Sequence, residues 1–240
     1  MNDSTGRTPD VTIGVDLGDK YSHLRVVDWD GKVISAERIE TTPEGFEKRF
    51  RGVPRARVVI EAGTHSPWVD RVLRDCGHES IVSNPRQVPL ISENNQKSDD
   101  HDPELLARLG RFDPKLLKPI EPRGFKEQIA LAELRARDSL VKARSQLVNH
   151  VRGVVKSFGG RTNGVGVSSF HKKAFEKIPE PIRESLRPML KVIAELKEQI
   201  SRYDKRVEEI AEEEYPQSAV LRQIAGVGAL TALAFLLVIG

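Results

Sequence analysis

Residues 11–18 read Val-Thr-Ile-Gly-Val-Asp-Leu-Gly, an apolar run of small and β-branched residues that closes on Asp16. A run of this length and composition predicts a buried β-strand. A carboxylate on such a strand carries a high desolvation cost unless a cation or hydrogen-bond donor pairs with it. We therefore expect a first strand whose last residues present Asp16 to a ligand.

The sequence on the C-terminal side of this strand alternates between strand and helix signals. Asp30-Gly31 predicts a tight turn between two further strands. Thr42-Pro43 and Ser66-Pro67 each have the form of a helix start, with a capping side chain followed by proline. The predicted strands are 11–17, 23–27, 33–39, 57–61 and 80–83, and the predicted helices are 42–50 and 66–76. This order predicts a mixed α/β sheet covered by helices.

Three further carboxylates extend the pattern that begins at Asp16. Glu61 ends the apolar run 58–61, so it would emerge at the same sheet edge as Asp16 if the two strands are neighbours. Asp99 and Asp102 are three residues apart and would share one side of a helix. Four convergent carboxylates could ionise together only with cations present, and Mg²⁺ prefers such oxygen ligands. A two-metal site of this kind cleaves phosphodiesters.

Each carboxylate also has a simpler interpretation, which the sequence leaves open. Asp102 stands directly before Pro103-Glu104 and is a good helix N-cap. A single acidic residue at a strand end is often only a loop contact. His23, His65 and His101 lack ligand spacing with Cys76 or with one another, which argues against zinc.

After residue 122 the sequence becomes helical. Residues 126–156 contain no proline and one glycine, and the apolar residues recur every seven positions, at Leu134, Val141, Val148 and Val155. A glycine-rich connector at 159–169 leads to a second apolar seam over 182–210, with Pro188 as an expected kink. Two such helices form either an antiparallel hairpin within the chain or an intermolecular coiled coil.

The positive charge of the chain is concentrated on the first of these helices. Residues 123–173 hold eleven Lys and Arg against three Asp and Glu, whereas 174–215 hold eleven acids and eight bases. This distribution indicates either a polyanion-binding element or a solvated helix face. The candidate nucleic-acid contacts are Arg135, Lys142, Arg144, Arg152 and Lys156.

The C-terminal segment 224–240 is apolar and has a glycine-rich turn near its start. Gly226 and Gly228 would open a helix whose free backbone N–H groups suit a phosphate. Residues 224–240 carry no charge, but seventeen residues is the lower limit for a membrane span, and no basic cluster follows. We therefore expect no membrane segment, and we expect the apolar end to lack an element that covers it.

Composition sets broader limits on the class of protein. The 240 residues are 38% hydrophobic and 30% charged, which is typical of a globular chain. A single cysteine excludes a disulfide framework and fits the reducing cytoplasm. The first 20 residues contain no apolar segment of the signal-peptide type, so we expect a cytoplasmic protein.

The motifs together resemble one known family. The matching segments are Gly14-Val-Asp16, Ile60-Glu61-Ala62-Gly63, Asn84-Pro85 and Lys97-Ser98-Asp99 with Asp102. In this order they resemble the DEDD-type insertion-sequence transposases, a family that is itself similar to RuvC-like resolvases and includes Piv-type invertases. One departure is Pro103, where the family usually has alanine; it would place Asp102 at the helix start.

The resemblance implies a fold, an activity and partners. It implies a ribonuclease-H-like fold with one or two Mg²⁺ ions on Asp16, Glu61, Asp99 and Asp102. It also implies an enzyme, a DNA transposase or site-specific recombinase, whose partners are the insertion-sequence ends, target DNA and a structured bridge RNA. A homo-oligomer through the helical coiled-coil arm would bring the DNA sites together.

The resemblance also divides the chain. It implies a RuvC-like nuclease domain at 1–122, a helical arm at 123–215, and at 216–240 the start of a C-terminal domain that resembles a helix-hairpin-helix. In the family that domain carries a serine thought to act as the nucleophile of strand exchange, and no residue here matches it. On this basis we expect a truncated copy or a fragment.

Two other functions remain as alternatives. Gly14-Val-Asp16-Leu-Gly18 also resembles the first phosphate loop of actin-like sugar kinases and ATPases, which need a second matching half where this chain becomes helical. The other alternative is a non-catalytic coiled-coil scaffold that binds nucleic acid.

Overall fold

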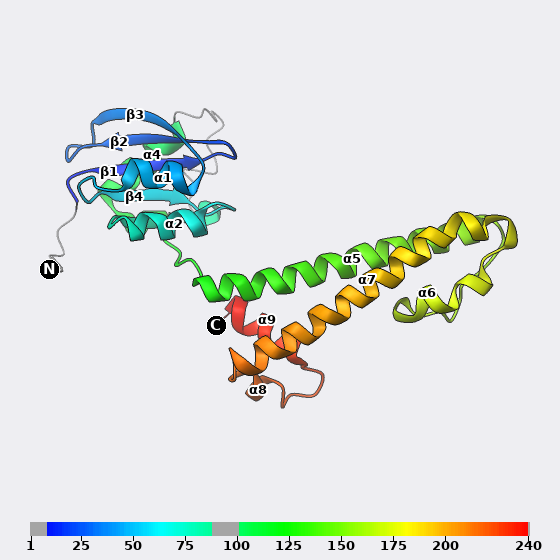
Figure 1. Ribbon diagram of the computed structural model, residues 1–240. Coiled ribbons are helices and arrows are strands. Elements are labelled where there is room, and N and C mark those ends of the chain that lie inside the picture. Colours follow the sequence, from blue (N-terminus) through cyan, green and yellow to red (C-terminus); the bar gives the residue numbers. More distant parts are fainter. Residues whose placement is uncertain (1–8, 88–100, 240) are drawn as a thin grey trace. The chain divides into compact units, whose positions relative to one another are not determined.

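The protein consists of two compact units, residues 1–123 and 124–240 (Figure 1). A computed structural model describes residues 9–87 and 101–239. The boundary between the units falls one residue after the end of the nuclease domain expected from the sequence. The further division of the helical part at residue 215 stays a prediction.

The first unit contains a five-stranded mixed sheet of order β3-β2-β1-β4-β5. The strands are β1 (Thr12–Leu17), β2 (Tyr21–Val27), β3 (Val33–Glu40), β4 (Arg57–Glu61) and β5 (Glu79–Ser83). β1, β2 and β3 pair in antiparallel fashion, whereas β4 pairs in parallel with both β1 and β5. Every strand expected from the apolar runs of the sequence is present, and the mixed sheet is confirmed.

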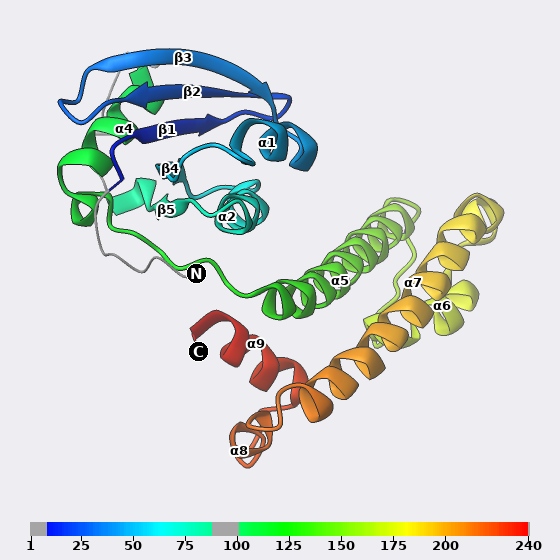
Figure 2. The ribbon, with the colours of Figure 1, turned by 60° about the vertical axis from the view of Figure 1, so that its left-hand side comes forward.

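Helices cover both faces of this sheet, as Figure 2 shows. They are α1 (Pro43–Phe50), α2 (Ser66–Asp75) and α4 (His101–Phe112). Ile13, Val15 and Ile60 pack with side chains of α1 and α2 in one core. Val59 packs with Leu106 of α4 in a second core on the opposite face. Alternate residues of β4 thus belong to different cores, as the two-residue period of a strand requires.

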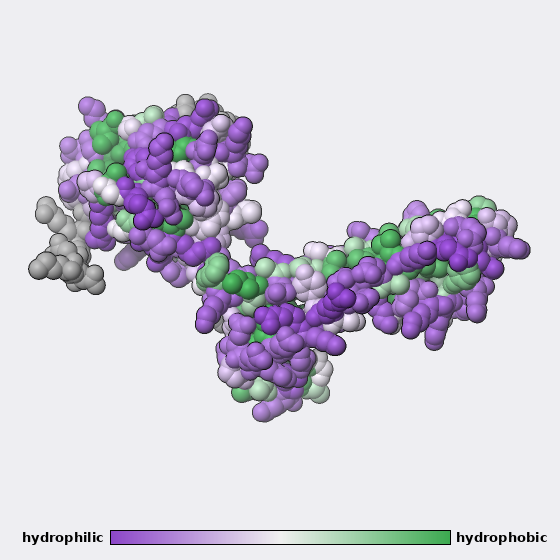
Figure 3. Space-filling view, viewed as in Figure 1, coloured by the Kyte–Doolittle hydropathy of each residue, from purple (hydrophilic) through white to green (hydrophobic). Residues whose placement is uncertain are grey.

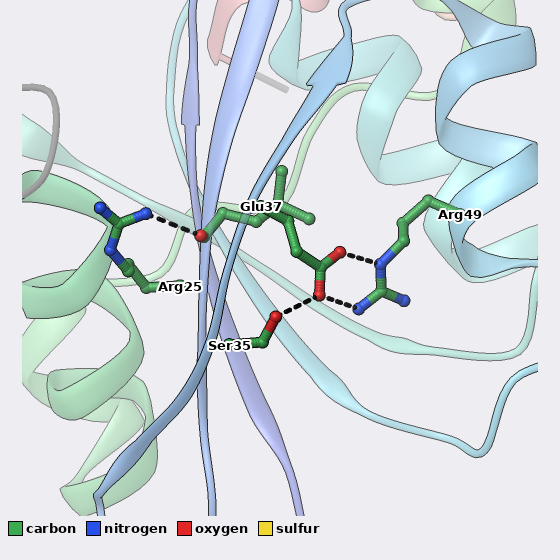
Figure 4. Close-up of polar contacts among 5 residues, drawn as sticks. Arg25, Ser35, Glu37 and Arg49 are labelled. Atoms are coloured by element: carbon green, nitrogen blue, oxygen red, sulfur yellow. Dashed lines mark hydrogen bonds and ion pairs between the residues drawn. The ribbon is translucent and has the colours of Figure 1, made fainter.

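A charged contact ties the outer strand β3 to helix α1 (Figure 4). The Arg49 guanidinium donates two hydrogen bonds to the Glu37 carboxylate, one of them 3.1 Å long, and Ser35 Oγ donates a third over 2.9 Å. The hydrogen bonds from Arg49 hold the pKa of Glu37 below its ordinary value. Nearby, Arg25 donates to the Leu24 carbonyl oxygen over 3.1 Å.

The second unit is a helical hairpin. Its helices are α5 (Phe125–Ser157), α6 (Phe170–Lys173), α7 (Glu180–Glu213), α8 (Ser218–Leu221) and α9 (Ala229–Ile239). α5 and α7 lie side by side in Figures 1 and 2, and Arg137 of α5 pairs with Asp204 of α7 at 2.6 Å. The structure therefore decides between the two arrangements that the seams left open: the hairpin forms within one chain. α7 continues as one helix through Pro188.

The seam between α5 and α7 holds two separate cores. One lies toward the hairpin loop, where Val148, Val151 and Val155 pack against Phe170 and Ile193. The other joins Ala130, Leu131 and Leu134 to the C-terminal end of α7 and to α9. Val141, expected in the seam, is only half-buried. Figure 3 shows hydrophobic side chains gathered along this seam.

The apolar C-terminal helix is partly covered, which corrects the expectation from the sequence. Ala229, Ala232, Leu233 and Leu237 of α9 are buried against α5 and α7. The sequence could not show this, because local patterns do not report which distant helices pack against α9. None of the helices in the described ranges is long and apolar enough to cross a bilayer.

The contact between β3 and α1 predicts a pH-dependent loss of stability. A carboxyl group whose pKa is lowered by folding stabilises the fold above its unfolded pKa, and this contribution disappears as the pH falls through the lowered, folded pKa. Glu37→Gln should therefore lower the free energy of unfolding at pH 7 by about 1 kcal/mol, since the pair is partly exposed.

Urea unfolding of both proteins at pH 7 and in acid measures this difference. The two curves should converge in acid, and a difference that persists below the folded pKa of Glu37 would contradict the role assigned to its carboxylate. Glu47→Gln is the matched control, because Glu47 pairs with Arg51 at 3.0 Å on the exposed face of the same helix.

Candidate functional site

Two of the predicted carboxylates end neighbouring parallel strands. β1 and β4 pair with Gly14 opposite Val59 and Val15 opposite Ile60, so the next register position places Asp16 beside Glu61. Because side chains alternate along a strand, Asp16 shares the face of Gly14, and Glu61 shares the face of Val59. This is the face that α4 covers. Both residues are half-buried.

The helix α4 approaches this face through a glycine. A Cβ placed on Gly14 would lie 1.8 Å from the Pro103 carbonyl oxygen and 2.6 Å from the Ala107 amide nitrogen. At the other end of α4, a Cβ on Gly110 would lie 2.4 Å from Val59 Cγ2 and 3.6 Å from Thr12 Cγ2. The helix therefore runs antiparallel to β1, with its N-terminal end toward the strand ends that carry the carboxylates.

This orientation brings the third predicted carboxylate toward the same edge of the sheet. Asp102 is the second residue of α4 and directly precedes Pro103, so it lies in the first turn of the helix, as the proline at position 103 indicated. Asp99 lies outside the described residues. Within the described ranges, no three Asp, Glu, His or Cys side chains come together closely enough to hold a metal ion. The four-carboxylate set stays a prediction.

A cavity of about 420 Å³ opens where the two strands end. Asp16 and Glu61 both line it, together with the loop that joins β4 to α2. Within this loop Ser66 Oγ donates to the Gly63 carbonyl over 2.9 Å and accepts from the Gly63 amide over 3.1 Å. These bonds close the loop and set its side chains at the mouth of the cavity.

His65, which the sequence did not indicate as a site residue, also lines this cavity. Its Nδ1 accepts a hydrogen bond from the Trp68 indole N–H over 3.2 Å, which assigns the neutral ring's proton to Nε2. Its Nε2 lies 3.9 Å from an Asp19 carboxylate oxygen, and both residues line the cavity with Asp16 and Glu61. The only signal in the sequence was position, four residues after Glu61, because His65 lacks metal-ligand spacing.

The five basic candidates on α5 do not share one environment. Arg135, Lys142 and Lys156 are exposed, and Lys142 pairs with Asp138 at 2.6 Å. Arg152 instead donates to the Val165 carbonyl over 2.8 Å and lies 5.4 Å from the Phe170 ring, so it holds the connector after α5. Arg144 Nε is buried without a hydrogen-bond partner among the described residues.

Helix geometry explains this separation. At about 100° per residue, Lys142 and Lys156 lie within about 60° of Arg135 around the helix axis, whereas Arg144 lies about 180° away. The seven-residue repeat of apolar residues shows which side of α5 is buried. It does not by itself show on which side each basic residue between them lies. The structure therefore leaves three of the five with exposed side chains.

The predicted glycine turn precedes α9. Gly226 has a φ of 86°, a left-handed conformation that suits glycine, and Gly228 directly precedes the first residue of the helix. The helix before the turn, α8, has only four residues. Phosphate binding at this turn stays a prediction.

Comparison with known families identifies the chain. The family model of the DEDD transposases of the IS110 type, described as transposase, matches residues 13–159. This match covers more than half of the chain and includes both carboxylate strands, α4 and the basic helix. The chain belongs to this transposase family. The membership and the mixed sheet described above agree with the fold class expected from the sequence, and the transposase family argues against the sugar kinase alternative.

Two curated relatives are also described as transposases. The chain is 25% identical over 199 residues to a probable family 20 transposase of Pseudomonas aeruginosa, covering 81% of this chain and 56% of that protein. It is 26% identical over 234 residues to the transposase for insertion sequence element IS1111A of Coxiella burnetii, covering 92% of this chain and 61% of that protein. The chain thus spans about three fifths of the length of these relatives.

Among solved structures, the chain is similar to RuvC of Thermus thermophilus. The two are 18% identical, with a TM-score of 0.26, over 48% of this chain and 83% of the RuvC chain.

The contact at Gly14 predicts the effect of one added methyl group. Gly14→Ala would force the Pro103 backbone away from β1, so the free energy of unfolding should fall by at least about 2 kcal/mol. Gly63→Ala is the matched control, since a Cβ there meets nothing within 4 Å. Thermal unfolding of both variants measures the effect, and equal stability of the two would show that α4 does not pack closely on β1.

Proposed function

We propose that this chain is the nuclease and arm portion of an insertion-sequence transposase that cleaves and exchanges DNA strands in a metal-dependent reaction. The observation that carries the proposal is the pair Asp16 and Glu61, side by side at the ends of parallel strands and open to one cavity. Family membership supports the reaction class.

The donor set fits a hard divalent cation. Asp16 and Glu61 supply carboxylate oxygens from adjacent strands, and Asp102 lies in the first turn of α4, at the end of the helix nearer that edge. Oxygen ligands of this kind favour Mg²⁺ over softer metals. We propose that Asp16, Glu61, Asp99 and Asp102 hold one or two Mg²⁺ ions. When bound, such ions activate a nucleophile and stabilise the leaving oxygen of a phosphodiester.

The elements around the cavity determine its walls and the side from which DNA could enter. A DNA phosphate at this cavity would face carboxylates, so we propose that bound metal ions supply the positive charge it needs. The hydrogen-bonded loop after β4 forms one wall, and α4 closes the face of the sheet beside the carboxylates. DNA would therefore approach along the open edge where β1 and β4 end.

The arm supplies a second surface for nucleic acid. Arg135, Lys142 and Lys156 are exposed and lie within one sector of α5, where they would bind phosphates without reading bases. The same surface suits a bridge RNA, which the family is known to use. Because the apolar seam is covered within the chain, assembly into homo-oligomers through the arm would use its outer faces. We propose that the protein acts on DNA in the cytoplasm.

The carboxylate pair predicts a specific loss of metal binding. Asp16→Asn and Glu61→Gln should each weaken Mn²⁺ or Mg²⁺ binding more than about tenfold, because each removes a charged ligand. Isothermal titration measures binding, and a nicking assay on a supercoiled plasmid bearing the element's ends measures cleavage by the complete transposase. Asp75→Asn, an exposed carboxylate at the end of α2, is the control and should bind metal normally.

Retention of full metal affinity by both variants would contradict the proposed site. If these variants and the unaltered protein all bind nucleic acid, and none shows a metal effect, the chain is the non-catalytic scaffold instead.

The arm predicts a change in salt dependence. Replacing Arg135, Lys142 and Lys156 by Gln should weaken binding to duplex DNA and reduce the slope of log K against log salt by about 2 to 3, since each phosphate contact contributes about 0.9. Fluorescence anisotropy over a salt series measures the slope.

A matched triple substitution on α7, Lys191, Lys205 and Arg206 to Gln, should leave the slope nearly unchanged, because that helix is acidic overall. Equal effects of the two triple variants would show that total charge, rather than the exposed face of α5, determines binding.

A further inference from the structure

A second cavity lies at the opposite end of the sheet from the carboxylates. Its volume is about 610 Å³, and it is bounded by the turn between β2 and β3 and by the C-terminal end of α4. Arg57, the first residue of β4, lines it, whereas Glu61, the last residue of that strand, lines the carboxylate cavity. The length of one strand therefore separates the two sites.

Two aromatic rings are exposed at this second cavity. Trp29, in the turn after β2, keeps 63% of its surface exposed, and Phe112, the last residue of α4, keeps 85%. Burial of such rings stabilises a fold, so rings left open at a cavity are available to a ligand. Pro114 is the other apolar residue among the described residues of the lining.

Arginines surround these rings. The Arg111 guanidinium carbon lies 3.9 Å from the centroid of the Trp29 ring, and its NH1 group donates to the Pro9 carbonyl over 2.6 Å. Among the described residues, no carboxylate lies within ion-pair distance of Arg111. The guanidinium thus lies over the indole in a cation–π contact, and Asp30 is the one acidic residue among the described residues that line the cavity.

The other two arginines at the cavity have different roles. Arg57 is almost fully buried and is bound to Glu79 at 2.9 Å and to the Gly110 carbonyl at 2.9 Å, so it forms the wall. Arg108 forms an exposed pair with Glu104 one turn earlier at 2.8 Å. Exposed pairs of this kind contribute little stability and exchange readily for a phosphate.

We propose that this cavity binds an unpaired nucleotide of a single-stranded nucleic acid. The base stacks on the Trp29–Arg111 pair and on Phe112, and the adjoining phosphate binds Arg108 and Arg111. A nucleobase has the planar face that these groups accept, and its phosphate has the complementary charge. A base inside a duplex has both faces covered by its neighbours, so the site selects unpaired strands.

The proposal is independent of the metal site and is tested without metal. The probes are twelve-residue oligonucleotides, oligo-dT and oligo-U, and a duplex of the same length, added to the full chain in the presence of a chelator. Trp29 reports binding through its fluorescence, and the Trp68→Phe background removes the signal of the other tryptophan. We expect saturable quenching by single strands and at least tenfold weaker binding of the duplex at this site.

Substitutions then locate the effect. Phe112→Ala and Arg111→Gln should each weaken single-strand binding by about tenfold, the loss typical of one stacking contact. Phe125→Ala, which removes an exposed ring on α5, and Arg51→Gln, which removes an exposed arginine paired with Glu47 in the first unit, should have little effect. Because Phe112 is exposed, its substitution should not alter thermal unfolding, which serves as the folding control.

Each outcome decides something. Quenching by oligo-U alone would show that the site binds RNA, and quenching by oligo-dT alone would show that it binds DNA. Quenching by both would show that the site accepts single strands of either kind. Unchanged Trp29 fluorescence, equal quenching by the duplex, or equal effects of the control substitutions would overturn the proposal. It would also be overturned if Trp29 fluorescence changed with protein concentration alone, which would indicate a contact between copies of the chain.

Discussion

The close packing of α4 on β1 at Gly14 is the contact on which the arrangement of the candidate site depends. No side chain fits between the strand and the Pro103 backbone, so glycine at this position sets how near the helix approaches and which end of it faces the carboxylates. Asp102 is one residue from this contact. A shift of α4 by even the width of a methyl group would therefore move a predicted ligand relative to Asp16 and Glu61.

The same helix connects the two cavities of the first unit. Its N-terminal turn lies toward the carboxylates, and its C-terminal residues Arg111 and Phe112 form part of the second cavity. Because a helix is stiff over twelve residues, the two sites keep a fixed separation along one element. A nucleic-acid strand held by stacking at one end of α4 would be positioned by the same rigid element that carries Asp102 at its other end.

Much of the fold could be predicted from local patterns, for identifiable reasons. The strands of the sheet are short apolar runs with clear turn residues such as Asp30-Gly31, and the long helices follow from sustained apolar repeats without proline. Asp16 and Glu61 were found because each interrupts an apolar run at its end. That these two carboxylates lie side by side could be predicted only if β1 and β4 are neighbours, and the strand register shows that they are.

Other features depend on contacts between distant residues. The sequence could not show which helix each apolar seam packs against, so the intrachain hairpin could not be predicted. The same holds for the contacts of α9 with α5 and α7. The sequence indicated that Arg144 and Arg152 are exposed charges. In the structure the Nε of Arg144 is buried, and Arg152 donates a hydrogen bond to the Val165 carbonyl oxygen in the connector after α5. The stacking of Arg111 on Trp29 joins residues 82 positions apart, which no local pattern reports.

The convergence of carboxylates on a divalent cation is tested most directly by anomalous diffraction from crystals of this chain grown with Mn²⁺. We predict a peak between Asp16 and Glu61 at the end of β1 and β4, with ligand oxygens about 2.1 Å away, the distance of a hard octahedral ion. A fully occupied peak elsewhere, or none at this edge at saturating Mn²⁺, would contradict the metal site.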